Sequence, residues 1–239
     1  MYEENKMFYR MFDLNIEIYP RFEYGKNLLK EYEIAFNGEP DIKVKISDND
    51  IRNETKNNPE HSDAYNEMVC IFRDITEKIL DFDGIFVHSA VVALDGIGYM
   101  FLGQSGVGKS THAIEWTKYF KNKATIINCD KPILRCIENE FIAYGNPWCG
   151  KEGLGVNDCV KIKSAAFIEQ SAINEISDLG KIEVFKKLLN QTVIPKSVKR
   201  KLKHYDLIDK LINEISFYNL KCDISKDAVI TAYNKMKTI

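Results

Sequence analysis

The sequence predicts an α/β fold in which a mixed sheet forms the core and a β-rich portion precedes it. Three observations predict this class. Apolar and polar residues alternate near the N-terminus, a tight turn joins two apolar strands in the middle of the chain, and a glycine-rich loop then links an apolar strand to a helical pattern. Strand–loop–helix units mixed with hairpins are typical of α/β proteins.

The N-terminal portion, residues 1–63, is predicted to be β-rich and to pack on the core. Apolar residues alternate with polar ones over 12–18 and again over 42–46, which is the period of a half-buried strand. The segment 47–63 is polar and rich in asparagine, so we expect a loop or linker there.

Residues 64–239 are predicted to form the main domain. Helical apolar spacing over 64–80 leads into one strand over 85–94, and the Asp95-Gly96 turn joins that strand to the next, over 98–102. A helix is expected over 109–120 after the glycine-rich loop.

The second half of this domain shows the same mixture of patterns. Strands are expected over 125–129, 133–136, 141–144, 161–169 and 217–224. Helices are expected over 181–190, from Tyr205 onward, and over 226–236 behind a Ser225 cap.

Composition and charge exclude several classes of protein. Hydrophobic residues make up 45% of the 239 residues and charged residues 28%, which excludes a collagen-like or wholly disordered chain. The formal net charge of −2 argues against a dedicated nucleic-acid binder, because neutralising phosphates needs a basic surface.

The cysteines and the apolar runs indicate a cytoplasmic protein that does not enter a membrane. The six cysteines form no CxxC pair, and no apolar run approaches the roughly 18 residues that span a bilayer. The N-terminal segment is polar and acidic, without the apolar stretch of a signal peptide. We therefore expect reduced thiols in the cytoplasm.

The most specific signal is a complete G-x-x-x-x-G-K-[ST] motif. It comprises Gly103, Gln104, Ser105, Gly106, Val107, Gly108, Lys109, Ser110 and Thr111. Glycines permit backbone angles that let successive N–H groups converge on anionic oxygens, and a helix N-terminus attracts the same charge. The alternative, a chance glycine-rich turn, is disfavoured by the strand before the motif and the helix after it.

The motif assigns a role to each polar side chain. The ammonium of Lys109 would reach the β- and γ-phosphates of ATP, and the hydroxyl of Ser110 would bind Mg²⁺. Asp130, directly after an apolar strand, is the candidate second ligand of the metal and a candidate base. The alternative for Asp130 is a turn or cap residue before Pro132.

Two further residues are candidate members of the catalytic site. His88 precedes the hairpin that leads to the glycine-rich loop; it is either a site residue or a core histidine with satisfied hydrogen bonds. Lys151 lies in a stretch over 144–153 that holds three glycines, Pro147 and Trp148. That loop either brings a lysine to a phosphate or an acidic group, or serves structure only with Trp148 as an apolar plug.

The segment from His88 through Asp95-Gly96 to the glycine-rich loop resembles the catalytic domain of HPr serine kinase/phosphorylase and its relatives, whose core is similar to phosphoenolpyruvate carboxykinase. The match runs over about 86–130. The stretch over 144–153 resembles that of HPr-kinase-like proteins associated with peptide maturation.

The resemblance implies site residues as well as a fold. His88 matches the family histidine that contacts phosphate or activates the acceptor, and Asp130 matches the second acid of a pair. Cys129 stands where the family has its first acid, which is implicated as the base and in the reverse reaction. The substitution speaks against phosphorylase activity and leaves Asp130 or His88 as the base.

We therefore expect an ATP- and Mg²⁺-dependent phosphotransferase that transfers the γ-phosphoryl group to a serine hydroxyl of a peptide, a protein or a small molecule. One alternative is a nucleotide-binding accessory protein in peptide maturation without transfer activity; a carboxykinase-like or hydrolytic use of the fold is a weaker one. The resemblance leaves a homo-oligomer open. The basic run over 196–203 either guides an acidic peptide or is a solvated face.

Overall fold

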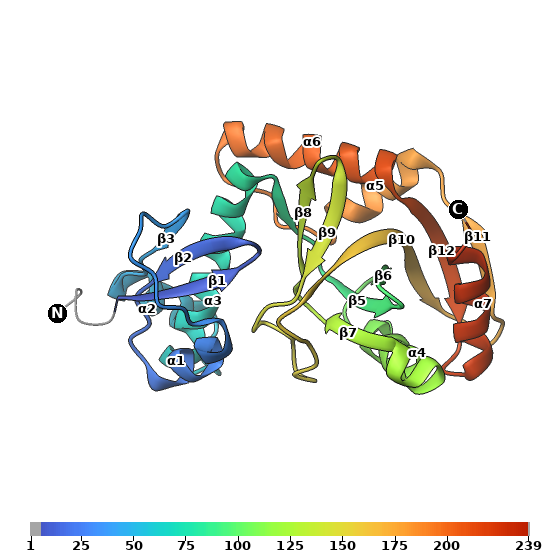
Figure 1. Cartoon of the computed structure of the whole chain (residues 1–239), viewed down its shortest axis with the longest axis horizontal. Coiled ribbons are helices and arrows are strands. Elements are labelled where there is room, and N and C mark those ends of the chain that lie inside the picture. Colours follow the sequence, from blue (N-terminus) through green and yellow to red (C-terminus); the bar gives the residue numbers. More distant parts are fainter. Residues whose placement is uncertain (1–5, 239) are drawn as a thin grey trace. The chain divides into compact units, whose positions relative to one another are not determined.

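The computed structural model describes residues 6–238, and the chain divides into two compact units, Met1–Phe82 and Asp83–Ile239. Figure 1 shows both units with their elements labelled. Residues 1–5 of the expected β-rich portion lie outside the described residues.

The first unit combines a three-stranded sheet with three helices. Its strands are β1 (Met7–Met11), β2 (Leu14–Ile18) and β3 (Ile42–Val44), and its helices are α1 (Glu23–Leu29), α2 (Asp48–Asn57) and α3 (Asp63–Lys78). β2 is the central strand, antiparallel to β1 and parallel to β3. The strands expected from the alternating stretches are confirmed at β2 and β3.

The predicted loop over 47–63 was wrong, because this segment contains α2. Ser47 caps the helix: its hydroxyl accepts a hydrogen bond from the Asp50 N–H at 3.2 Å, and the Asp50 carboxylate accepts one from the Ser47 N–H at 2.8 Å. The helix buries Ile51 and Glu54, and Glu54 pairs with Arg73 of α3 at 2.7 Å. These contacts outweigh the low helix propensity of the asparagines.

The chain divides into its two units after Phe82, whereas the boundary predicted from the sequence lies after Asp63. α3 packs on α1, α2 and β3, so it belongs to the first unit, which ends with a short 3₁₀ segment at Phe82. The second unit is therefore shorter at its N-terminal end than the predicted domain.

The second unit is a mixed α/β structure built on a nine-stranded sheet. The order is β4-β8-β9-β10-β6-β5-β7, with β12 paired to β10 and β11 paired to β12. β10 runs parallel to β6 and β12, and the remaining pairs are antiparallel. The strands are β4 (Gly84–Phe86), β5 (Ser89–Leu94), β6 (Ile97–Leu102), β7 (Ala124–Asn128), β8 (Ile133–Ile137), β9 (Glu140–Tyr144), β10 (Cys159–Gln170), β11 (Glu175–Asp178) and β12 (Ser216–Cys222).

Four helices cover this sheet. Figure 1 shows α4 and α7 on one side of it and α5 and α6 on the other. α4 contacts β5, β6 and β7, whereas α6 contacts β4, β9 and β12. Their bounds are α4 (Lys109–Phe120), α5 (Lys181–Leu189), α6 (Val198–Glu214) and α7 (Lys226–Met236).

Most elements of the second unit are confirmed, with two corrections and one omission. The single strand predicted over 85–94 is two strands: β4 pairs with β8, and β5 lies between β6 and β7. The chain changes partners at Val87 and His88, which no local pattern reveals. α6 begins at Val198 rather than Tyr205, because Ser197 caps it, so the basic run lies in its first turns except for Lys196, which precedes the helix. β11 was not predicted.

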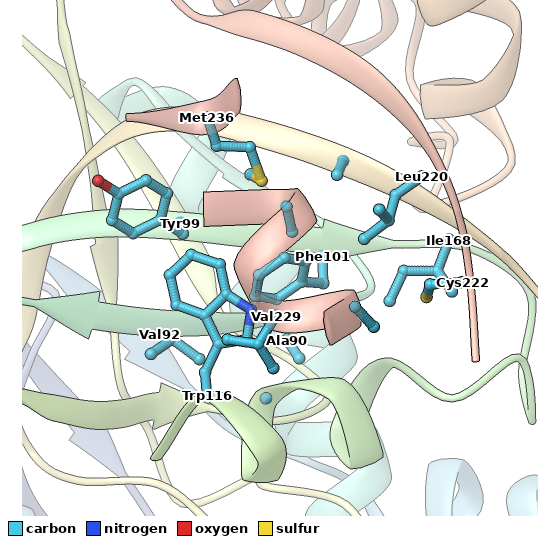
Figure 2. Close-up of a cluster of buried hydrophobic side chains, with 14 of the residues drawn as sticks. Ala90, Val92, Tyr99, Phe101, Trp116, Ile168, Leu220, Cys222, Val229 and Met236 are labelled. Carbon is cyan, nitrogen blue, oxygen red and sulfur yellow. The ribbon is translucent and has the colours of Figure 1, made fainter. Parts of the chain in front are cut away.

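The core under α4 and α7 is centred on Trp116, which is fully buried. Figure 2 shows its ring among the side chains of β5, β6 and α7. Its ring centroid lies 4.9 Å from that of Tyr99 and 5.2 Å from that of Phe101. Because α4 is fixed by this packing, its N-terminus holds a defined position beside the end of β6.

His112, one turn before Trp116, makes this core sensitive to acid. Its Nε2 accepts a hydrogen bond from the Trp116 indole N–H at 3.0 Å, and burial lowers the pKa of His112 from 6.5 to about 4. Between pH 6.5 and pH 4, His112 is therefore protonated in the unfolded chain but stays neutral in the folded state. Stability from this group is present above pH 6.5 and is lost as the pH falls toward 4, by about 3 kcal/mol in total.

We expect His112→Gln, which keeps an acceptor for Trp116, to lose less stability than the wild type between pH 7 and pH 5. Urea unfolding at several pH values measures this difference, and the comparison removes the contribution of His204, another histidine whose pKa burial lowers. Equal losses in both proteins would contradict the assignment.

No helix among residues 6–238 has the length and apolar composition that crossing a bilayer requires.

Candidate functional site

The glycine-rich loop connects β6 to α4, as predicted. Gly103, Gly106 and Gly108 have φ angles of +142°, +79° and +107°, which side chains disfavour. A Cβ at Gly106 or Gly108 would meet no atom within 4 Å, so open space adjoins the backbone there. A helix N-terminus next to exposed backbone and open space suits a phosphate group.

Lys109 is buried at the base of this loop. Its Nζ donates hydrogen bonds to the carbonyl oxygens of Gly103 at 2.9 Å and Gln104 at 3.1 Å. Burial lowers the pKa of Lys109, and the negative charges of Asp130 and Glu152 oppose that shift. An ammonium that is poorly solvated and held by neutral carbonyls is well suited to an anionic ligand.

Sheet register explains why His88, Gly103 and Asp130 meet. β5 lies antiparallel between β6 and β7, with Ser89 opposite Leu102 and Val91 opposite Asn128. The residue before β5 therefore adjoins the residues that follow β6 and β7. The Ser89 N–H donates to the Asp130 carbonyl at 3.3 Å.

Asp130 and His88 form a half-buried pair. His88 Nε2 lies 3.2 Å from Asp130 Oδ1, and Lys131 donates to the other carboxylate oxygen. Burial alone would raise the pKa of Asp130, but the hydrogen bonds from His88 and Lys131 lower it to about 2. The carboxylate is thus ionised at neutral pH, and it orients the imidazole ring.

Ser110 approaches the same place from the first turn of α4. Its hydroxyl donates to the Cys129 carbonyl at 3.4 Å, one residue before Asp130. Cys129 itself is buried, and burial raises the pKa of its thiol to about 12. Cys129 therefore stays protonated and cannot replace a missing carboxylate as a base.

A buried pair of asparagines, which the sequence analysis missed, fixes the turn at Asp130. Asn128 Oδ1 accepts from the N–H groups of Asp130 and Lys131, both at 2.8 Å. Asn146 Nδ2 donates to the Lys131 carbonyl at 2.6 Å. Both asparagines are fully buried. The only sequence signal is asparagine at the end of an apolar strand.

Gln191 is a second residue that the sequence analysis missed. Its backbone carbonyl accepts from the His88 N–H at 2.7 Å. With its side-chain nitrogen facing the two carbonyls, it donates to His88 at 3.1 Å and to Gly103 at 2.9 Å. Gln191 follows α5, so this segment is tied to the histidine and to the start of the glycine-rich loop.

The 144–153 stretch returns to the site, but the predicted role of Lys151 stays a prediction. Gly150 lies against Asp130, because a Cβ at this glycine would be 2.8 Å from Asp130 Cβ. Trp148 is buried, as the structural alternative expects, while Lys151 is exposed at the tip of the loop. Cys149 donates its thiol hydrogen to the Asn146 carbonyl at 2.9 Å.

The backbone packs so closely around Gly145 that a methyl group added at this residue would displace the 144–153 stretch. A Cβ there would lie 1.8 Å from the Val156 carbonyl oxygen and 2.7 Å from that of Ile127, and neither backbone atom can move freely. We expect Gly145→Ala to destabilise the protein by about 1–3 kcal/mol or more in urea unfolding. Gly180→Ala, where a Cβ meets no atom within 4 Å, is the matched control. Equal unfolding midpoints would contradict the prediction.

Two cavities adjoin the loop and share Val107 in their linings. The first has a volume of about 740 Å³, and the second about 580 Å³. His88, Gly103–Val107, Lys187 and Gln191 are among the residues that line the first. The second is lined by residues of α4, including Thr111 and Glu115, and by the turns that follow β10 and β12.

The side chains of Ser110 and Asp130 offer the type of ligand atom that Mg²⁺ binds. The hydroxyl of Ser110 and the carboxylate of Asp130 are oxygen ligands, which this metal prefers. Among residues 6–238, no three His, Cys, Asp or Glu side chains are grouped as a metal cluster. A metal here would therefore share its ligands with phosphate oxygens, as Mg²⁺ in nucleotide sites does.

Comparison with known proteins finds similarity in structure but none in sequence. No protein-family model and no curated protein matches the chain in sequence. The HPr(Ser) kinase/phosphatase from Coxiella burnetii is similar in structure, with a TM-score of 0.35 and 10% sequence identity, over 64% of this chain and 99% of that one.

Proposed function

We propose that the protein is an ATP-dependent phosphotransferase that acts on a serine hydroxyl of a peptide, a protein or a small molecule. One observation carries the proposal. The glycine-rich loop with Lys109, the hydroxyl of Ser110, and His88 with its partner Asp130 all lie at one end of the neighbouring strands β5, β6 and β7. An anion site beside a positioned proton acceptor is what phosphoryl transfer requires.

In this proposal the loop amides and Lys109 hold the triphosphate. Ser110 and Asp130 would hold Mg²⁺, which when bound neutralises charge on the phosphate oxygens. Lys109 would exchange its two loop carbonyls for phosphate oxygens and oppose the charge that develops during transfer.

His88 is the better candidate for the base. A carboxylate with a pKa of about 2 is a weak proton acceptor near neutral pH, so Asp130 suits orientation and metal binding better. His88 would take the serine proton as the serine oxygen bonds to the γ-phosphorus. The bond from that phosphorus to the β–γ bridging oxygen then breaks, and ADP leaves.

The two cavities suggest separate places for the substrates. His88 lines the first cavity and not the second, so the acceptor would enter through the first. The nucleoside would then occupy the second, beside the first turns of α4. Its lining includes Glu115 and Asp223, and carboxylates can accept hydrogen bonds from ribose hydroxyls.

The test is transfer of label from γ-labelled ATP, with Mg²⁺, to a panel of serine-containing peptides and of small molecules that carry a serine hydroxyl. Labelled phosphoserine in the wild type, absent with Lys109→Ala, supports the proposal. ATP hydrolysis without labelled peptide or small molecule, or transfer unchanged in the variant, would reject it.

A nucleotide-binding accessory protein is the second candidate, and the state of Cys129 favours it. The buried, protonated thiol cannot serve as a base, so the site has a single carboxylate at the end of β7. Tight ATP binding without transfer to any acceptor would support this candidate. In that case Cys129→Asp is the informative variant, since restored transfer would show that only the second acid is lacking.

A further inference from the structure

One surface of the second unit combines exposed apolar side chains with positive charge. It comprises Val193, Ile194 and Lys196 of the segment after α5 and Val198, Lys199, Leu202 and Tyr205 of α6, all exposed, together with the half-buried Lys201. We call it the α5–α6 surface.

Apolar exposure is concentrated here. Six of the twelve large hydrophobic side chains that are exposed among the described residues lie between Ile182 and Tyr205. Val198 is 73% exposed and Leu202 67%. On α6, Val198, Leu202 and Tyr205 are spaced i, i+4 and i+7, so they form one row on the helix.

This row is distinct from the face that α6 buries. His204, Leu207, Ile208, Leu211 and Ile212 form the buried stripe. With 100° between successive residues, the centre of the exposed row lies roughly 120° around the helix from the centre of that stripe. Figure 1 shows α6 on the outer side of α5 and β8. Exposing such an apolar row to water costs free energy, and a binding partner or a neighbouring copy of the chain would remove that cost by covering the row.

The first half of the row lies among positive charges, whereas Asp206 and Asp209 follow its C-terminal end. Residues 181–205 hold eight basic residues and one acidic residue, a net charge of +7, although the whole chain carries −2. Some of these charges are paired within the protein: Lys187 with Glu169 and Glu183, and Lys203 with Asp83. By helical spacing, Lys199 and Lys201 flank the apolar row on its two sides.

The surface is continuous with the candidate site. Its first apolar residue, Val193, follows Gln191 by two positions, and Gln191 bonds to both His88 and Gly103. Lys187, Asn190 and Gln191 line the first cavity. A chain lying along α6 toward α5 would therefore reach the cavity that contains His88.

We propose that the α5–α6 surface docks an acidic segment with apolar side chains, carried by the peptide or protein whose serine enters the first cavity. The proposal rests on the phosphotransferase function above and narrows its acceptor to a polypeptide. Leucine-like side chains would cover the Val198–Leu202–Tyr205 row, and carboxylates would meet Lys199 and Lys201. Charge complementarity of this kind sets which partner binds and how fast.

Binding without ATP tests the surface directly. The probe is a fluorescein-labelled peptide in which glutamates and leucines flank one serine, compared by anisotropy with a counterpart that has lysine in place of glutamate. We expect the acidic probe to bind the wild type at least about tenfold more tightly than the basic one, and added salt to weaken it.

Two double variants and one matched control locate the binding. Lys199→Glu with Lys201→Glu, and Val198→Asp with Leu202→Asp, are each expected to weaken binding of the acidic probe about tenfold or more. Lys121→Glu with Lys123→Glu makes the same change in net charge at the same spacing beyond α4 and should leave binding unchanged. Circular dichroism confirms that each variant is folded.

The outcomes separate this proposal from the proposed function. Equal binding of the two probes, or binding that the surface variants leave intact, would overturn the docking surface even if the enzyme transfers phosphate. If both surface variants lose binding and the wild type transfers no phosphoryl group, the docking surface is supported and the phosphotransferase function is rejected. A concentration-dependent dimer that Val198→Asp with Leu202→Asp abolishes would assign the surface to a second copy and overturn the proposal.

Discussion

Replacing Lys109 with alanine is expected to weaken ATP binding about tenfold to a hundredfold and to abolish phosphoryl transfer. The lysine is buried under the loop, and its ammonium is placed to follow the phosphate oxygens from substrate to transition state. A hydrogen bond from a charged group contributes about 1.5–3 kcal/mol, which corresponds to that range of affinity. Calorimetric titration with ATP and the labelled-transfer assay measure the two effects.

Lys161→Ala is the matched control for this variant. Lys161 is an exposed lysine of β10 that pairs with Glu140, whereas Lys109 is 6% exposed and bonded to the loop. We expect the Lys161 variant to bind ATP as the wild type does. Thermal denaturation shows whether the Lys109 variant is folded. A folded Lys109→Ala protein with wild-type ATP affinity would mean that the loop does not hold the triphosphate.

The local part of the site could be predicted from the sequence because its determinants are local. The loop from Gly103 to Ser110 requires glycines at fixed spacing between a strand and a helix, and both neighbours were visible in the apolar pattern. Asp130 could be placed because it directly follows an apolar strand near the loop. These inferences need no knowledge of distant contacts.

The supporting contacts could not be predicted, because they join residues far apart in the chain. Gln191 meets His88 and Gly103 only after α5 has packed on the sheet, and no residue pattern near position 191 indicates this. The link between Asn128 and Asn146 likewise depends on how the 144–153 stretch returns to β7. The split of the predicted strand at His88 has the same cause, since β4 and β5 pair with different strands.

That split also decides how His88 is interpreted. As the middle of one apolar strand, it would have been equally well explained as a core residue. In the structure it lies between two strands, with a side chain that is 30% exposed and bonded to Asp130. The register of β5 with β6 and β7, rather than the histidine alone, makes it a candidate base.

Asp130→Asn is expected to keep the fold and ATP binding but to lower Mg²⁺-dependent transfer about a hundredfold or more. The amide has nearly the shape of the carboxylate and can still accept one hydrogen bond, but it lacks the charge that pairs with His88 and Lys131 and that would bind the metal. Because hydrogen bonds hold the pKa of Asp130 near 2, the wild-type carboxylate is ionised throughout the usual assay range. Its stabilising contribution is present above pH 3.8 and is lost only as the pH falls toward 2.

The defect of this variant should therefore be the same at pH 6 and at pH 8, and kcat rather than the KM for ATP should change. Asp178→Asn, which alters an exposed carboxylate paired with Lys235, is the control and should retain full activity. A defect that disappears at one end of this pH range would point to a titrating group other than Asp130. Wild-type turnover in a folded Asp130→Asn protein would remove Asp130 from the chemistry and leave His88 without the partner that orients it.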